Sequence, residues 1–95
     1  MGRGYYIMEI KIATRHCTDP VGTQRCFHYF LTVDQEETAQ LFCENYGVHI
    51  AEEHGSDASI PAITTSAQRI DELMTLLVDN QVGPAGLADV LADWL

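Results

Sequence analysis

Residues 65–95, TSAQRIDELMTLLVDNQVGPAGLADVLADWL, decide the fold that this sequence predicts. Apolar residues recur there at intervals of three and four, which places them on one face of a helix. They form two groups, first Ile70, Leu73, Met74, Leu77 and Val78, then Leu87, Val90, Leu91, Trp94 and Leu95. Thr65 and Gln68 match a capping box, and Pro84 suits the first position of a second helix. The stretch therefore predicts two amphipathic helices joined at Gly83-Pro84.

Two stretches upstream, residues 5–16 and 25–33, alternate polar and apolar side chains as half-buried strands do. The turn-rich segment CTDPVGTQ separates them, so they predict a β-hairpin. Its apolar faces must coincide, which sets even-numbered residues of the first strand opposite odd-numbered residues of the second. Two registers satisfy this rule. One places Cys17 opposite Cys26, where a disulfide could form, and the other places Arg15 there.

The middle of the chain is less clearly patterned. Asp34 with Glu37 matches a capping box, so a short helical turn or loop is expected at residues 34–40. A strand over residues 42–52 should follow, with YGVHI at 46–50 as its clearest part. Residues 54–57, HGSD, predict a turn, and residues 59–63, SIPAI, predict a brief edge strand because Pro61 cannot donate to a ladder.

Length and composition indicate one domain over residues 1–95, with residues 1–4 expected to be disordered. The fold class is α+β, an antiparallel sheet of three or four strands with two C-terminal helices packed on one face. No apolar run approaches the roughly 18 residues of a membrane helix, and no signal peptide is evident. Three cysteines without CxxC spacing do not suggest a disulfide framework. These features predict a cytoplasmic protein.

Charge is distributed unevenly along the chain. The net charge is −9, with four of the five basic residues before residue 34 and twelve of the fourteen acidic residues from residue 34 onward. A negative field repels phosphate, so direct binding to nucleic acid is not expected. Such acidity serves either solubility or attraction to a basic protein.

The second half of the chain resembles a known family. The run YGVHI at 46–50 and the terminus VGPAGLADVLADWL at 82–95 resemble small uncharacterised proteins from anaerobic Gram-positive bacteria. The resemblance spans residues 46–95 and implies a small bacterial cytoplasmic protein, with no activity or site to transfer. The sequence departs from that family's terminus in having Gly83 for Ser, Gly86 for His and Trp94 for Phe.

The leading functional hypothesis is a non-enzymatic protein-interaction or regulatory module, with a basic protein as partner or a second copy of the chain. Its narrowest form is an inhibitor that mimics nucleic acid. The expected partner-binding residues are Glu36, Glu37, Glu44, Glu52, Glu53 and Asp57. No phosphate-binding loop and no catalytic arrangement is recognisable, so neither an enzyme nor a cofactor is predicted.

The alternative hypothesis is a small-ligand or metal-binding domain. Cys17, Cys26 and His28 could meet on the polar face of the hairpin, and thiolate with imidazole is a ligand set that zinc prefers. The spacing of these three residues matches no established zinc motif.

Overall fold

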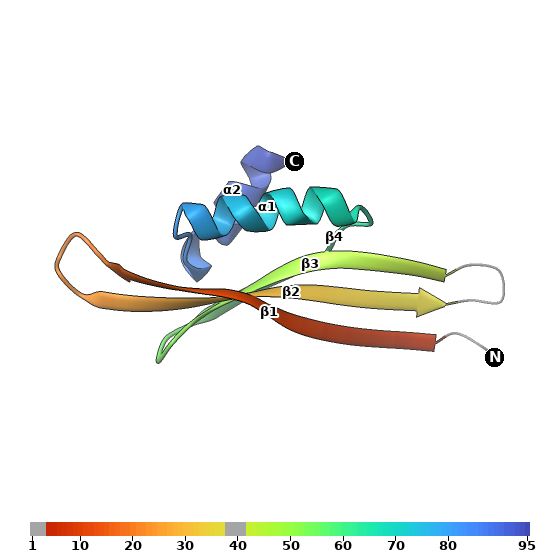
Figure 1. Cartoon of the computed structure of the whole chain (residues 1–95), viewed down its shortest axis with the longest axis horizontal. Coiled ribbons are helices and arrows are strands. Elements are labelled where there is room, and N and C mark those ends of the chain that lie inside the picture. The colour runs from red at the N-terminus through yellow and green to blue at the C-terminus, as the bar shows by residue number, and fades with distance from the viewer. Residues whose placement is uncertain (1–3, 38–41) are drawn as a thin grey trace.

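A computed structural model describes the backbone of residues 4–37 and 42–95, and the side chains of residues 8–35 and 42–95. The chain forms strands β1 (Gly4–Thr18), β2 (Gln24–Glu37), β3 (Phe42–Glu52) and β4 (Asp57–Thr64). Helix α1 (Ala67–Asp79), a 3₁₀ turn (Pro84–Gly86) and helix α2 (Leu87–Trp94) follow. The strands make one antiparallel sheet in the order β1-β2-β3-β4 (Figure 1). The α+β class with two C-terminal helices is confirmed.

The core is one buried cluster that the sheet and the helices share, and the face of the sheet that carries its strand residues is here called the inner face. Alternation places odd-numbered residues of β2 and even-numbered residues of β3 on it, as their pairing requires. The buried cluster comprises Phe27, Tyr29, Val48 and Ile50 from the sheet and Ile70, Leu73, Met74, Leu77, Leu87 and Leu91 from the helices. Each helix therefore buries part of its predicted apolar stripe, whereas Leu95 at the end of the second stripe is 77% exposed.

A β-bulge divides the β1–β2 hairpin into two registers. Before Ile12 the pairing follows one of the two predicted registers, with Ile10 opposite Leu31, and after it the pairing shifts by one residue, with Ala13 opposite Tyr29. Beyond the bulge, residues of equal parity are paired, so the rule of even against odd fails there. The extra residue changes which side chains of β1 face the core.

The bulge separates the two hairpin cysteines. His16 lies opposite Cys26, and Cys17 lies opposite Arg25 on the inner face, where it packs against the core. All three cysteines are free thiols. The predicted pairing of Cys17 with Cys26, and the disulfide that depended on it, are therefore wrong.

The helical turn or loop expected at residues 34–40 is wrong for residues 34–37, which continue β2; residues 38–41 lie outside the described part of the chain. Asp34 pairs with both Ile7 and Asn45, so neighbouring strands take up its backbone on both sides. The ladder thus outweighs the local capping signal. The strand predicted over residues 42–52 is confirmed.

Local hydrogen bonds fix the ends of α1. Ser66, not the predicted Thr65, is the N-cap, and its hydroxyl accepts a hydrogen bond from the Arg69 amide at 3.1 Å. After the helix, the buried Tyr29 hydroxyl donates to the Val82 carbonyl at 2.8 Å and ties the connection to the sheet. Pro84 then opens the 3₁₀ turn that leads into α2.

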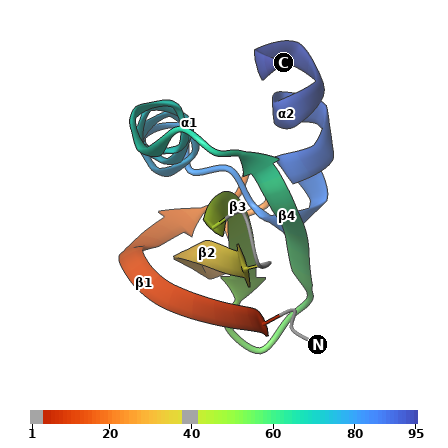
Figure 2. The ribbon, with the colours of Figure 1, turned by 90° about the vertical axis from the view of Figure 1, so that its right-hand side faces the viewer.

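The sheet is strongly curled. Viewed end-on, β1 and β4 curve away from the helices on either side of β2 and β3 (Figure 2). The other face of the sheet, here called the outer face, is therefore concave, and it buries Thr32 and Asp34 to 5% and 6% exposure. Gly47 permits the close approach of β4 to β3, because a Cβ there would collide with the Ile60 carbonyl.

The start of the chain and the character of its helices bear on two of the expectations drawn from the sequence. Residues 1–3 of the expected disordered terminus lie outside the described residues, and Gly4 opens β1. None of the helices formed by the described residues has the length and apolar character needed to cross a membrane.

Candidate functional site

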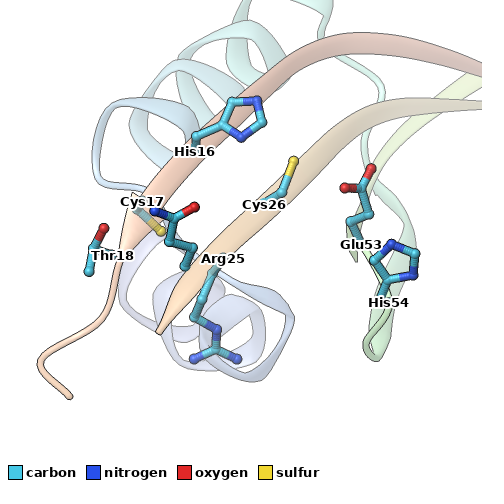
Figure 3. Close-up of a pocket in the computed structure, with 8 residues that line it drawn as sticks. His16, Cys17, Thr18, Arg25, Cys26, Glu53 and His54 are labelled. Atoms are coloured by element: carbon cyan, nitrogen blue, oxygen red, sulfur yellow. The ribbon is translucent and has the colours of Figure 1, made fainter. Parts of the chain in front are cut away.

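A group of side chains that could hold a metal ion gathers on the outer face near one end of the sheet, and Figure 3 shows two of its members, Cys26 and Glu53. Cys26 and His28 lie two residues apart on β2 and therefore share a face of the sheet. Glu53 follows the end of β3, in the turn to β4. The Cys26 sulfur lies 3.8 Å from the His28 Nε2, which lies 3.4 Å from a Glu53 oxygen. A backbone hydrogen bond from the Glu53 amide to the Cys26 carbonyl, 2.9 Å long, holds the turn against β2. We call these three residues the thiol–imidazole cluster.

The surroundings of the cluster bear on its chemistry. The Thr14 hydroxyl on β1 lies 3.1 Å from the His28 Nδ1, on the side of the ring away from Cys26 and Glu53. Burial, and then the charge of Glu53, raise the pKa of the Cys26 thiol. Because a catalytic cysteine needs a lowered pKa, this arrangement does not favour nucleophilic catalysis.

A pocket of about 380 Å³ opens beside the cluster. Its lining includes Cys26, Glu53, His16 and His54, which come from three different segments of the chain. The sequence-based metal hypothesis named Cys17 as a ligand, but the structure turns Cys17 to the inner face and brings Glu53 to Cys26 and His28 instead.

The predicted partner-binding carboxylates divide between the two faces of the sheet. Glu44 and Glu52 pair with inner-face residues of β2. Glu52 accepts two hydrogen bonds of 2.8 Å from Arg25. These hydrogen bonds are the main reason that the pKa of Glu52 is lowered. Glu44 accepts hydrogen bonds from Gln35 and Tyr46.

The remaining four of these carboxylates lie elsewhere. Asp57 is on the outer face and Glu53 is in the β3–β4 turn, whereas the side chains of Glu36 and Glu37 fall outside the described residues. The described members thus form separate groups rather than one continuous patch.

His49 forms a second polar group at the centre of the outer face. Its Nδ1 lies 2.9 Å from a Glu9 oxygen on β1, and its Nε2 lies 2.9 Å from an Asp57 oxygen on β4. The ring also stacks on Phe30, with 5.2 Å between centroids. Burial lowers the pKa of His49, but the hydrogen bonds and charges of Asp57 and Glu9 outweigh it, so the net shift is upward. A protonated ring can donate to both carboxylates.

An apolar depression, here called the β1–α1 groove, lies between β1 and α1. It joins two hollows of about 140 and 160 Å³ that share Ile12, Asp71 and Met74. Its other lining residues are Ala13, Leu31, Tyr46, Ala67, Ile70, Thr75, Val78 and Asp79. Ile12, the residue at the bulge, remains 48% exposed there, and the neighbouring Ile10 is 43% exposed.

These features define the class of protein, a small α+β domain with a curled four-stranded antiparallel sheet and two C-terminal helices. The chain belongs to the family of unknown function DUF6514, whose model matches residues 8–95. Membership of an uncharacterised family agrees with the resemblance stated above, and the match also covers the N-terminal hairpin. The comparisons with curated proteins and with solved structures gave no match.

Sequence reasoning missed Glu53 as a partner of Cys26 and His28, and Glu9 as a partner of His49. Glu9 and His49 are 40 residues apart, so no local spacing could have paired them. Glu53 carried a weak signal, because it follows directly after the predicted strand 42–52, whose end must lie beside the start of β2 in an antiparallel sheet.

Proposed function

We propose that this protein is a non-enzymatic interaction module that binds a basic, amphipathic segment of a partner protein in the β1–α1 groove. The observation that carries the proposal is the exposure of Ile12 above an apolar floor that is bordered by carboxylates. The proposal takes both helices to pack on the inner face, which their shared buried cluster supports. It retains the basic partner inferred from the charge and moves the contact from the predicted carboxylates to the groove.

The chemistry of the groove supports this choice of partner. Asp71 lines both hollows and Asp79 lines one of them. No ion pair among the described residues uses either carboxylate, so both can meet lysine or arginine on a ligand. They are eight residues apart on α1, about 12 Å along the helix axis. Apolar side chains of the ligand would cover Ile12 while its cations meet this rim.

The edge of the sheet offers a further means of binding. Within residues 4–37 and 42–95, β1 pairs with β2 alone. The backbone N–H and C=O groups along its other edge are therefore available to an added strand. A segment in extended conformation beside β1 would place alternate side chains toward α1. This geometry supports backbone hydrogen bonds for affinity and groove contacts for specificity.

Nucleic-acid mimicry and a cytoplasmic location are two further elements of the proposal. Mimicry of nucleic acid is less well supported than the groove, because Glu52 pairs with Arg25 and Asp57 with His49. A cytoplasmic location is supported by the three free thiols, since reducing compartments keep cysteines unpaired.

Peptide selection tests the proposal directly. Twelve-residue peptides would be selected from a random display library on the full chain and counter-selected on Ile12→Glu. We expect enriched peptides to combine apolar residues with lysine or arginine. Their affinity, measured by fluorescence anisotropy, should fall about tenfold on Ile12→Glu, which is about 1.4 kcal/mol. It should also weaken in Asp71→Asn/Asp79→Asn and at high salt.

The matched control is Val21→Glu, which places the same charge on a side chain 86% exposed at the tip of the hairpin. It should leave peptide affinity unchanged. The proposal fails if no peptides are enriched, or if the enriched peptides lack cations and bind Ile12→Glu equally well. Sedimentation is the third arm: a dimer that Ile12→Glu dissociates would identify a second copy as the occupant and contradict a basic partner.

A further inference from the structure

We propose that the thiol–imidazole cluster is a zinc site, with Cys26, His28 and Glu53 as its protein ligands. Thiolate sulfur, imidazole nitrogen and carboxylate oxygen are the three ligand types that zinc uses in proteins. One atom of each type lies within 4.8 Å of the other two in this group. The inference is independent of the β1–α1 groove, because the cluster occupies the opposite face of the sheet.

Two of the three separations between the ligand atoms agree with tetrahedral coordination. Zinc bonds of about 2.3 Å to sulfur and about 2.1 Å to nitrogen or oxygen imply about 3.6 Å between S and N, and about 3.4 Å between N and O. The structure gives 3.8 Å from the Cys26 sulfur to the His28 Nε2, and 3.4 Å from that nitrogen to the Glu53 oxygen. Binding therefore requires small adjustments of side chains rather than a rearrangement of the strands.

Thr14 supplies the second contact that zinc-binding histidines use. Metal-ligating imidazoles donate their other N–H to an oxygen, which fixes the tautomer and the direction of the ring. The His28 Nδ1 lies 3.1 Å from the Thr14 hydroxyl, and the tautomer that donates from Nδ1 to this hydroxyl would present its Nε2 lone pair to Cys26 and Glu53. Thr14 on β1 contacts the His28 ring, and the His28 side chain is only 20% exposed.

The surrounding pocket leaves room for a fourth ligand. Glu53 is 52% exposed and lines a hollow of about 380 Å³ that His16 and His54 also line. A site with three protein ligands and one position open to water or a small anion is the arrangement that the described residues make. The ion would join β2 to the β3–β4 turn, two segments otherwise linked at this point by the Glu53–Cys26 backbone hydrogen bond.

Metal titration of the reduced, chelator-treated full chain tests the site. We expect one zinc ion per chain by calorimetry, and a sulfur-to-metal charge-transfer band when cobalt replaces zinc. Cys26→Ser should abolish the band and weaken zinc binding at least a hundredfold. Glu53→Gln should weaken zinc binding about tenfold. Thr14→Val should also weaken it about tenfold, because the His28 ring loses the contact that orients it.

Cys17→Ser and Cys43→Ser are the matched controls, because each removes one thiol outside the cluster. Both should keep full zinc affinity and the cobalt band. Circular dichroism of each variant without metal checks that the fold is retained, and Glu53→Gln supplies a second test if Cys26→Ser fails to fold. The proposal is overturned if zinc does not bind, or if Cys17→Ser weakens binding as much as Cys26→Ser does.

Discussion

His49 connects three strands through a single ring, and its charge decides how strongly it does so. Glu9 on β1 and Asp57 on β4 both accept hydrogen bonds from the protonated ring. They therefore make the pKa of His49 higher in the folded protein than in the unfolded chain. A raised folded pKa stabilises the fold below the unfolded value of about 6.5, and this contribution is lost as pH rises through the folded value.

We therefore predict that His49→Gln destabilises the fold at pH 5.5 more than at pH 8.5. Both carboxylates are more than a third exposed, at 44% and 66%, so solvent screening should limit the difference. A difference of about 0.5–1 kcal/mol in the free energy of unfolding is expected from urea titrations with chelator present. His16→Gln, an exposed histidine on the same face, is the control. A deficit that does not vary with pH would contradict the assignment.

Gly47 allows β4 and the Thr32 side chain to approach β3 closely. A Cβ at this position would lie 2.7 Å from the Thr32 hydroxyl oxygen and 2.6 Å from the Pro61 Cα, and would also collide with the Ile60 carbonyl. Two of these neighbours are backbone atoms of β4, which cannot move without breaking the β3–β4 ladder.

Gly47→Ala should accordingly lower the free energy of unfolding by about 2–3 kcal/mol. Gly86→Ala is the matched control, because its Cβ would meet only Val82 Cγ1 at 3.4 Å. That variant should be neutral or slightly stabilising, since alanine loses less backbone entropy than glycine. Equal losses in both variants, measured by urea unfolding, would refute a specific steric role for Gly47.

The start of α1 shows that a capping motif in the sequence need not be the cap that forms in the helix. Thr65 and Gln68 have the spacing of a capping box, yet the helix begins one residue later and the Ser66 hydroxyl caps it. Thr65 remains exposed, while the Thr64 hydroxyl accepts a hydrogen bond from the Ser66 amide at 3.1 Å. β4 extends to Thr64, so the strand sets where the helix can start.

Ser66→Ala should therefore lower the free energy of unfolding by about 1 kcal/mol through loss of the cap. Thr65→Ala should change it by less than about 0.5 kcal/mol, as exposed substitutions usually do. Thermal unfolding of the two variants beside the parent chain distinguishes the caps. The reverse order of effects would restore the capping box expected from the sequence.

The whole molecule is long for its core. It measures 54 × 26 × 18 Å, and the two helices cover only the middle of the sheet (Figure 1). Tyr29, Val48 and Ile50 are fully buried in one cluster with residues of both helices, whereas the tip of the β1–β2 hairpin extends beyond the helices. Local opening should start where few side chains are buried.

Hydrogen exchange should reveal this gradient along the strands. We expect backbone amides of Tyr29 and Ile50 to exchange at least about tenfold more slowly than those of residues 18–24 at the hairpin tip. Exchange followed by NMR on the chelated protein measures it. Uniform protection along β1 and β2 would show instead that the hairpin opens only with the whole molecule.

The amino-acid sequence by itself determined the features that depend on near neighbours. Alternation predicted the hairpin and the strand from Phe42 to Glu52, and the apolar stripes predicted both helices. These periodicities follow from backbone geometry over a few residues, which is why they could be recognised in one sequence.

The tertiary structure alone decided the features that depend on how strands lie against one another. The bulge at Ile12 turned Cys17 toward the core, and the antiparallel ladder made residues 34–37 a strand. The curled sheet brought Glu9 to His49, and the β3–β4 turn brought Glu53 to Cys26. Each outcome follows from contacts between distant segments, whose free energies outweigh local propensity and leave no periodic signal in the chain.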